Sequence, residues 1–382
     1  MSPQRDPRLS LALAAIGLGL AFVLLALELA LRLLPVCTLL PSLAVNEANP
    51  ALRYEPNQDG VWSQGAAMRY AVRYRVNNFG FVNDQNYRTA DPRPLVAVIG
   101  DSFVEALMVP PEETFHALLA QQLSGRARVY SFSRSGVALS QYLAYADWAR
   151  QLFHPHRLII NVVGNDFDES FTRYKDGPGL YSFPESTAGG PALTRKDYAP
   201  GPLSHLAQHS HLMMYLLANL HAHLLPQTIA RLFHPPRPEE YAENTRREAD
   251  ADRMAHGDLA LTLFLKLLPE LSGLPREHIL LVVDGNRSDI YTKPPAGTPR
   301  SYAQTMLEAL AQRARALGFP VVELEQAFAQ DYARRHLPFE VPGDGHWSGL
   351  GHKVVADAIL ASGFFDPYLA ETASGTARRP AQ

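Results

Sequence analysis

The sequence predicts an α/β protein built on a parallel sheet, and two patterns carry that prediction. Short apolar runs recur between residues 95 and 324, and amphipathic helical patterns fall between them. Continuous apolar runs are typical of parallel strands, because helices cover both faces of such a sheet. The runs are Leu95–Ile99, Ala127–Phe132, Leu158–Val163, Ile279–Val283 and Val321–Leu324.

Two helical stripes are clear between the first three runs. Phe115, Leu118, Leu119 and Leu123 form one stripe, and Leu139, Tyr142, Leu143 and Ala146 form the next. Residues at these spacings share one face of a helix. The strand and helix alternation then stops over residues 171–275, which we interpret as a largely helical insertion next to the site.

Composition excludes several classes of protein. The chain has 382 residues, 47% hydrophobic residues and a formal net charge of −3, which describes a globular protein without a nucleic-acid partner. Its single cysteine, Cys37, excludes an intramolecular disulfide and a cysteine-based metal site. Among the histidines of the insertion, only His205 and His209 have same-face helical spacing, and no carboxylate is in register with them, so no metal is expected.

An apolar N-terminal segment predicts a membrane anchor. Leu9–Leu27 contains one polar side chain, Ser10, and apolar character continues to Val36. Nineteen helical residues span about 28 Å, close to the thickness of the hydrocarbon layer. The alternative is a cleaved signal peptide, whose apolar region is normally only about 7–15 residues long. The length favours an uncleaved anchor.

The charges around this segment predict its orientation. Arg5 and Arg8 precede the span, and basic residues in a short tail favour a cytoplasmic N-terminus. The expected location is therefore the inner (cytoplasmic) membrane, single-pass, with the catalytic domain periplasmic or extracellular. The expected organisation is a cytoplasmic tail (1–8), an anchor (9–36), a linker (37–68), an outer domain (69–368) and a disordered tail (369–382).

The strongest chemical signal is Gly100-Asp101-Ser102, which directly follows the first apolar run. Ligands of α/β folds bind beyond the carboxyl ends of the parallel strands, so a serine at this exit is well placed for a nucleophile. The alternative is that Ser102 merely caps a helix, since serine is favoured at helix N-caps. Asp101 is expected to hold the loop by hydrogen bonding.

Three further segments supply the other groups that acyl transfer through serine requires. A base must take the hydroxyl proton, a carboxylate must orient the base, and donors must hold the oxyanion. His346 and Asp344 can serve as base and orienting group, in the chain order Ser, Asp, His. The segments are Ser131–Gly136, Gly164-Asn165-Asp166 and Asp344–His352.

These four blocks together resemble the SGNH (GDSL-type) hydrolase family, over about residues 95–360. The resemblance implies a three-layer flavodoxin-like sandwich and esterase or acetyl-transfer activity. By the same resemblance, Ser102 is the nucleophile and first oxyanion donor, Gly136 the second donor, and Asn165 the third. His346 matches the family's base and Asp344 the carboxylate that orients it.

The last block departs from most of the family. Asp344 and His346 are separated by one residue, whereas most members have two, and this spacing resembles the alginate-acetylation relatives. Alanine or serine stands at Ala106, Ser133 and Ala138, where members often carry glycine. These departures concern the fit of the substrate more than the nucleophile.

Some polar residues near the predicted site have two interpretations. Asp284 and Arg287 follow the fourth apolar run, and they either bind substrate or form a mutual ion pair. Asp166 is a catalytic neighbour or a turn former. His352 begins the last helix and is expected to pack in the core.

The sequence therefore predicts a membrane-anchored serine esterase that acts on carboxylic esters, with O-acetyl groups of a cell-envelope or extracellular glycan as substrate. It needs no cofactor and no metal. One alternative is an O-acetyltransferase that acts on a polysaccharide with a membrane acyltransferase partner. Another is a non-catalytic glycan-binding protein on the same fold. The intact Ser102, Asn165, Asp344 and His346 argue against the latter.

Overall fold

The computed structural model describes residues 7–185, 193–202, 207–221, 249–295 and 297–366. Most of the predicted cytoplasmic tail and the predicted disordered tail 369–382 lie outside these residues. The helices are α1 (Pro7–Leu31), α2 (Ser102–Glu105), α3 (Phe115–Gln122), α4 (Leu139–Phe153), α6 (His211–Met214), α8 (Ala251–Ser272), α9 (Arg287–Thr292), α10 (Tyr302–Ala316), α11 (Leu324–Arg335) and α12 (Gly349–Ala361). The strands are β1 (Gln58–Gln64), β2 (Arg69–Val76), β3 (Leu95–Gly100), β4 (Arg128–Ser133), β5 (Arg157–Val162), β6 (Tyr181–Ser182), β7 (Thr194–Arg195), β8 (Ile279–Val283) and β9 (Val321–Glu323).

A five-stranded parallel sheet forms the centre of the larger part of the chain, in the order β4-β3-β5-β8-β9. Numbered along the chain, this order is 2-1-3-4-5, which is the flavodoxin-like order. Each strand lies within a residue or so of its predicted apolar run. The predicted α/β fold with a parallel sheet is thus confirmed.

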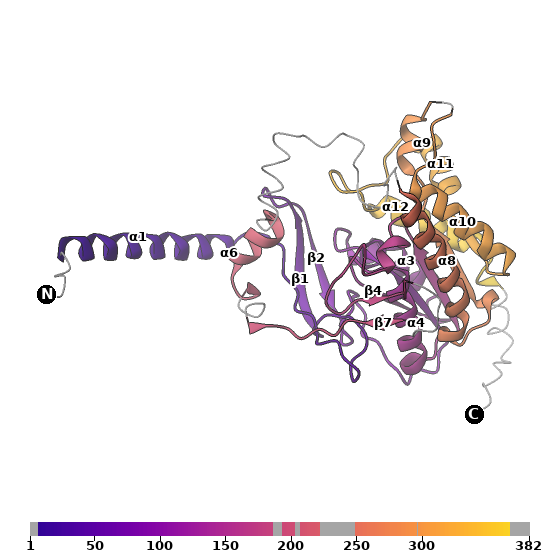
Figure 1. Cartoon of the computed structure of the whole chain (residues 1–382), viewed down its shortest axis with the longest axis horizontal. Helices are drawn as coiled ribbons and strands as arrows, with labels where there is room; N and C mark the ends of the chain where they lie inside the picture. The colour runs from indigo at the N-terminus through magenta and orange to yellow at the C-terminus, as the bar shows by residue number, and fades with distance from the viewer. Residues whose placement is uncertain (1–6, 186–192, 203–206, 222–248, 296, 367–382) are drawn as a thin grey trace. The chain divides into compact units, whose positions relative to one another are not determined.

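Both faces of the sheet are buried, which explains why its strands are apolar without alternation. Ala97, Phe132 and Leu281 belong to the core under α4, α8 and α10. Val98, Ile159 and Val282 belong to the core under α3, α11 and α12. Figure 1 shows α8 and α10 side by side. The arrangement is a three-layer sandwich.

The chain folds into two compact units. The smaller unit contains residues 1–41, 60–73 and 200–234, and the larger unit contains the rest. Residues 42–59, which fall in the predicted linker, thus belong to the larger unit. There, Tyr198 and Val45 pair through both of their backbone groups at 2.9 Å.

The smaller unit is organised around the end of α1. Glu28, in the last turns of α1, accepts hydrogen bonds from the backbone N–H groups of His211 and Leu212 at 3.1 and 2.9 Å. It thereby satisfies N–H groups at the start of α6 that have no partner inside the helix. Asn219, the last residue of a π-helical turn (Tyr215–Asn219), accepts from the Cys37 N–H at 2.9 Å and donates to Ser63.

The segment Ser10–Leu31 of α1 is long and apolar enough to cross a membrane, with a mean hydropathy of 2.5. By length and composition, both an anchor and a signal sequence meet this description.

Within the described residues of the predicted insertion, short elements such as β6, β7 and α6 precede α8. β6 and β7 form a two-residue antiparallel pair. Residues 203–206 and 222–248 of the insertion lie outside the described residues. α8 is a long helix of its described part, and it packs on α4 through Leu261 and Phe264 in the main core.

Candidate active site

The site is built first at the exit of β3, where the chain turns directly into α2. Gly100 permits this turn, because a Cβ there would lie 2.3 Å from the Cγ2 atom of Val104. Asp101 is the N-cap of α2, and its side chain accepts a hydrogen bond from the Phe103 N–H at 2.9 Å. Ser102 is therefore the first residue of a helix whose start is fixed by the turn at Gly100 and by the Asp101 cap. Asp101 thus holds the loop by hydrogen bonding, as expected.

Three side chains form a continuous chain of hydrogen bonds at this point. The Oγ of Ser102 lies 2.7 Å from Nε2 of His346, and Nδ1 of His346 lies 2.5 Å from Oδ1 of Asp344. A carboxylate can only accept, so Nδ1 carries the imidazole proton. In the neutral ring Nε2 is then the acceptor, and the Ser102 hydroxyl donates to it.

Asp344 is fixed in its ionised form beside the imidazole. Its Oδ1 also accepts from the His346 N–H at 2.9 Å. Burial alone raises the pKa of Asp344, but hydrogen bonds and charge interaction with His346 outweigh it, and the net pKa is lowered. The carboxylate therefore holds one tautomer and one orientation of the ring.

Gly136 and Asn165 lie in the two loops that flank Ser102. In the sheet, Gly100 is opposite Ser133 of β4, and Ile99 is opposite Ile160 of β5, so the three strands end at the same edge. Gly136 has φ of +77°, a conformation that glycine adopts without strain. The half-buried Asn165 lies in the turn after β5, which ends at Val162.

Glu105 holds the loop that carries Gly136, and sequence reasoning missed it. The Ser135 N–H donates to Oε2 of Glu105 at 2.8 Å, and the Ser135 hydroxyl donates to the same atom. Glu105 is 1% exposed, so its carboxylate is shielded from solvent while it holds Ser135 in the loop. The one available signal was its position three residues after Ser102, on the same short helix.

A second acidic group missed by sequence reasoning lies near Asp101. Glu169 pairs with Lys175, and the Lys175 ammonium lies 3.6 Å from the position that a Cβ on Gly136 would occupy. This ion pair borders the Gly136 loop. No motif in the sequence connects residues 136 and 175.

Asp166 is a structural carboxyl of the third loop. It accepts from the Tyr142 hydroxyl and from the Val163 N–H, both at 2.8 Å. Burial and the nearby Asp101 raise its pKa well above the ordinary value. This geometry is that of a turn former, one of the two interpretations of the sequence. It also keeps the chain next to Asn165 in place.

Of the two alternatives for Asp284 and Arg287, the structure contains the ion pair. Nη1 of Arg287 lies 2.6 Å from Oδ1 of Asp284, and their side chains are 9% and 8% exposed. Side chains so deeply buried and paired do not present their charges to a substrate. His352 packs in the core, where its Nδ1 accepts from the Phe115 N–H at 3.2 Å.

No family model matches the sequence, and no curated protein matches it either. Solved structures similar to the chain include a lipolytic G-D-S-L family protein from Veillonella parvula, with 10% identity, 70% of this chain and 96% of that chain covered, and a TM-score of 0.36. A lipase/acylhydrolase from Enterococcus faecalis has 11% identity, with 72% and 96% covered and a TM-score of 0.37. The acetyl xylan esterase AlAXEase has 10% identity, with 70% and 98% covered and a TM-score of 0.38. At these values the likeness assigns neither a reaction nor a substrate to this chain.

The burial of Asp101 generates a pH-dependent prediction. Desolvation raises the pKa of Asp101 to about 6, so between its ordinary value of 3.8 and about 6 the folded state binds more protons than the unfolded chain. The free energy of unfolding must therefore fall as pH rises through this window. Asp101→Asn keeps a cap oxygen but removes the charge. We expect it to gain stability relative to the wild type at pH 7, and to gain less at pH 4, in urea unfolding of the detergent-solubilised chain.

Asp91→Asn is the matched control, because the neighbouring Arg93 lowers the pKa of Asp91. Its carboxylate contributes stability that is already present above the ordinary pKa of 3.8, so this variant should lose about the same stability at pH 7 and at pH 4. An Asp101→Asn effect that is the same at both pH values would contradict the assignment of a buried, proton-retaining carboxyl.

Proposed function

We propose that this protein is a serine esterase that hydrolyses carboxylic esters through Ser102, His346 and Asp344. The observation that carries the proposal is the unbroken hydrogen-bond chain from the serine hydroxyl through the imidazole to the carboxylate. Such a chain is the arrangement that activates a serine for acyl transfer. The alternative role of Ser102 as a helix cap is filled by its neighbour, because Asp101 is the N-cap of α2.

Each step of the reaction has a group in place. His346 takes the Ser102 proton at Nε2 while Oγ attacks the carbonyl carbon of the ester. The positive charge that develops on the imidazole is stabilised by Asp344, whose pKa is lowered. The protonated His346 then donates to the leaving alcohol. In the second half, water attacks the acyl group with His346 again as the base, and the acid is released.

The negative charge on the carbonyl oxygen needs donors at the same sheet edge. The N–H groups of Ser102 and Gly136 and the side-chain amide of Asn165 are the donors in this proposal. Support comes from the strand register, which ends β4, β3 and β5 together, and from the positive φ of Gly136. Glu105 contributes indirectly, since it fixes Ser135 next to Gly136.

For the substrate, we propose O-acetyl groups on a glycan outside the cell. The one-residue spacing between Asp344 and His346 supports this choice, because it resembles the alginate-acetylation relatives. Acetyl transfer to a sugar hydroxyl uses the same residues. Incubation of the chain with a chromogenic acetyl ester, with and without an acceptor glycan, distinguishes the two, because mass spectrometry shows whether acetate or acetylated glycan forms.

We further propose that α1 is an uncleaved anchor and that the larger unit faces the periplasm or the exterior. The length and hydropathy of Ser10–Leu31 support it, as do Arg5 and Arg8 before the span. A C-terminal reporter that is active only after export should give a signal, and the full-length chain should stay with the membrane fraction. A reporter signal confined to the cytoplasm, or a shortened soluble product, would contradict this topology.

Ser102→Ala and His346→Ala are each expected to lower kcat by several orders of magnitude without unfolding the protein. Nucleophile and base act as a unit, so the double variant should lose about as much as either single variant. His336→Asn, at an exposed histidine that ends α11, is the matched control and should keep full activity. A Ser102→Ala protein of unchanged thermal stability that still turns over the acetyl ester would remove Ser102 from the mechanism.

Asn165→Ala tests the donor that rests on the least direct observation. If the amide stabilises developing charge, kcat should fall by about 10²–10³-fold. KM should change little, because the interaction strengthens only in the transition state. Steady-state kinetics at matched thermal stability separate the two constants. A loss confined to KM, or a loss of stability without a loss of kcat, would make Asn165 a turn residue only.

A further inference from the structure

The segment that carries both Asp344 and His346 is a short hairpin between α11 and α12, residues 339–348. Its two arms are joined by backbone hydrogen bonds, from Ser348 to Phe339 at 2.6 Å and from Val341 to His346 at 3.0 Å. A turn bond from the Asp344 N–H to the Val341 carbonyl closes the tip at 2.9 Å. These local bonds shape the hairpin, but they do not fix it against the sheet that carries Ser102.

Arg287, the first residue of α9, connects this hairpin to the residue that follows β8. Its Nε lies 2.6 Å from Oε1 of Glu340 on the first arm. Its Nη2 donates to the carbonyl oxygen of Gly345 on the second arm at 3.1 Å. Its Nη1 lies 2.6 Å from Oδ1 of Asp284, which follows β8 directly. One rigid guanidinium therefore binds three separate points.

The contacts around this guanidinium leave it little freedom to move. Asp284 is itself held, since its Oδ1 accepts from the Gly285 N–H at 2.8 Å and its own N–H donates to Val162 of β5 at 3.0 Å. The ring of Phe103, next to Ser102, lies 5.7 Å from the guanidinium carbon. The Arg287 side chain is 9% exposed. The anchor is thus part of the sheet edge that bears the nucleophile.

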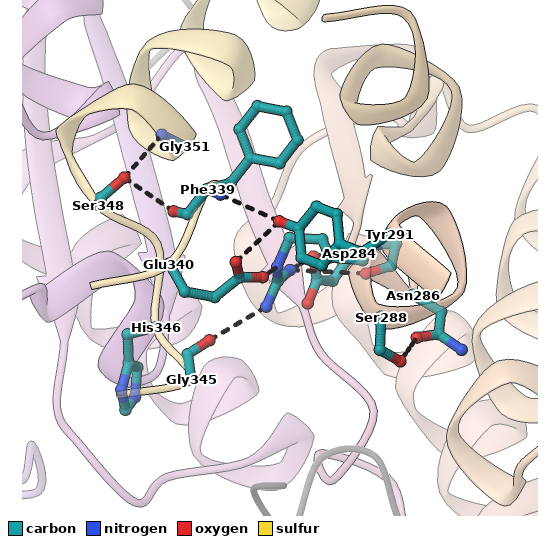
Figure 2. A network of polar contacts seen from close by, with 12 residues as sticks. Asp284, Asn286, Ser288, Tyr291, Phe339, Glu340, Gly345, His346, Ser348 and Gly351 are labelled. Atoms are coloured by element: carbon teal, nitrogen blue, oxygen red, sulfur yellow. Dashed lines mark hydrogen bonds and ion pairs between the residues drawn. The ribbon is translucent and has the colours of Figure 1, made fainter. Parts of the chain in front are cut away.

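Tyr291, one turn further along α9, reinforces the hairpin arm. Its hydroxyl donates to Oε2 of Glu340 at 2.7 Å and accepts from the Phe339 N–H at 3.0 Å (Figure 2). Both oxygens of Glu340 are therefore occupied, one by Arg287 and one by Tyr291. Removing the tyrosine hydroxyl weakens the arm without removing the buried charge pair.

The Gly345 contact distinguishes this arrangement from a stabilising ion pair. The carboxylates of Asp284 and Glu340 neutralise the charge of Arg287. Its third donor, Nη2, nevertheless binds the carbonyl oxygen of Gly345, which directly precedes the catalytic base. A shift of that peptide moves the imidazole of His346 relative to Ser102. The hydrogen bond between His346 Nε2 and Ser102 Oγ is only 2.7 Å long. Catalytic geometry tolerates little such movement.

We propose that Arg287 is a positioning residue that sets the distance of His346 from Ser102 by tying both arms of the hairpin to Asp284. The proposal rests on the proposed esterase function, in which His346 is the base. Lysine cannot replace arginine here, because its single ammonium lacks the planar fork that reaches three acceptors. Tyr291 acts in the same direction through Glu340, with a smaller effect.

The test compares Arg287→Met, Arg287→Lys and Tyr291→Phe in the full chain solubilised in detergent. Two readouts are needed: kcat and KM with an acetyl ester, and the far-downfield proton resonance of the His346 Nδ1–H, identified by its loss in Asp344→Asn. Arg128→Met is the matched control. Arg128 is also a buried arginine that donates to backbone carbonyls, those of Arg93 and Arg88, but it begins β4 at the opposite edge of the sheet.

We expect the two Arg287 variants to lose about 10–100-fold in kcat with KM unchanged, as a misplaced catalytic group does. Their Nδ1–H resonance should broaden or disappear, Tyr291→Phe should show a smaller change in both, and Arg128→Met should keep both. Should Arg287→Met fail to fold, Arg287→Lys and Tyr291→Phe decide the matter.

Wild-type kcat and an unchanged resonance in the folded Arg287 variants would overturn the proposal, and so would an equal loss of kcat in Arg128→Met. If the wild type hydrolyses no ester, the proposed function fails. The resonance still shows whether Arg287 orders the hairpin that carries Asp344 and His346, so the two failures remain distinguishable.

Discussion

The parallel pairing of β3 with β4 and β5 is the constraint on which the rest of the structure depends. It ends three strands at one edge, so that the loops after β4 and β5 each begin one strand spacing from the loop after β3. Helices cover both faces, which leaves the carboxyl edge as the place where polar side chains converge. Ser102, Gly136 and Asn165 each follow one of these strands.

The proposed base lies at this edge on a segment that does not follow a strand of the sheet. His346 and Asp344 lie on an irregular hairpin after α11, and they depend on side-chain contacts for their position. The carboxylates of the site divide into two groups. Asp344 orients the imidazole of His346. Glu105 and Asp166 hold loops through backbone N–H groups, and Asp284 does so through Arg287. Buried acids that hold loops are as much a part of the site as the reacting groups.

Much of the fold was predictable, because a sheet that helices cover on both faces requires continuous apolar strands. Runs such as Leu95–Ile99 and Ile279–Val283 are typical of such strands. The motif at the exit of the first strand likewise predicted Ser102, and the block before the last helix predicted His346. The sequence could not reveal the partners of Glu105, or the contacts of Arg287 with Glu340 and Gly345, because a lone charged residue has no periodicity and its acceptor is set by tertiary packing. Two-residue strands such as β6 are too short to leave a pattern.

The central claim is that Ser102 is an activated nucleophile, and covalent labelling tests it most directly. A fluorophosphonate reacts with a serine only where a neighbouring base accepts its proton and the oxyanion is stabilised. Peptide mapping by mass spectrometry after treatment of the full chain should place one phosphonyl group on Ser102. The labelling should require a folded protein. An unlabelled chain, or a label on a serine other than Ser102, would contradict the account.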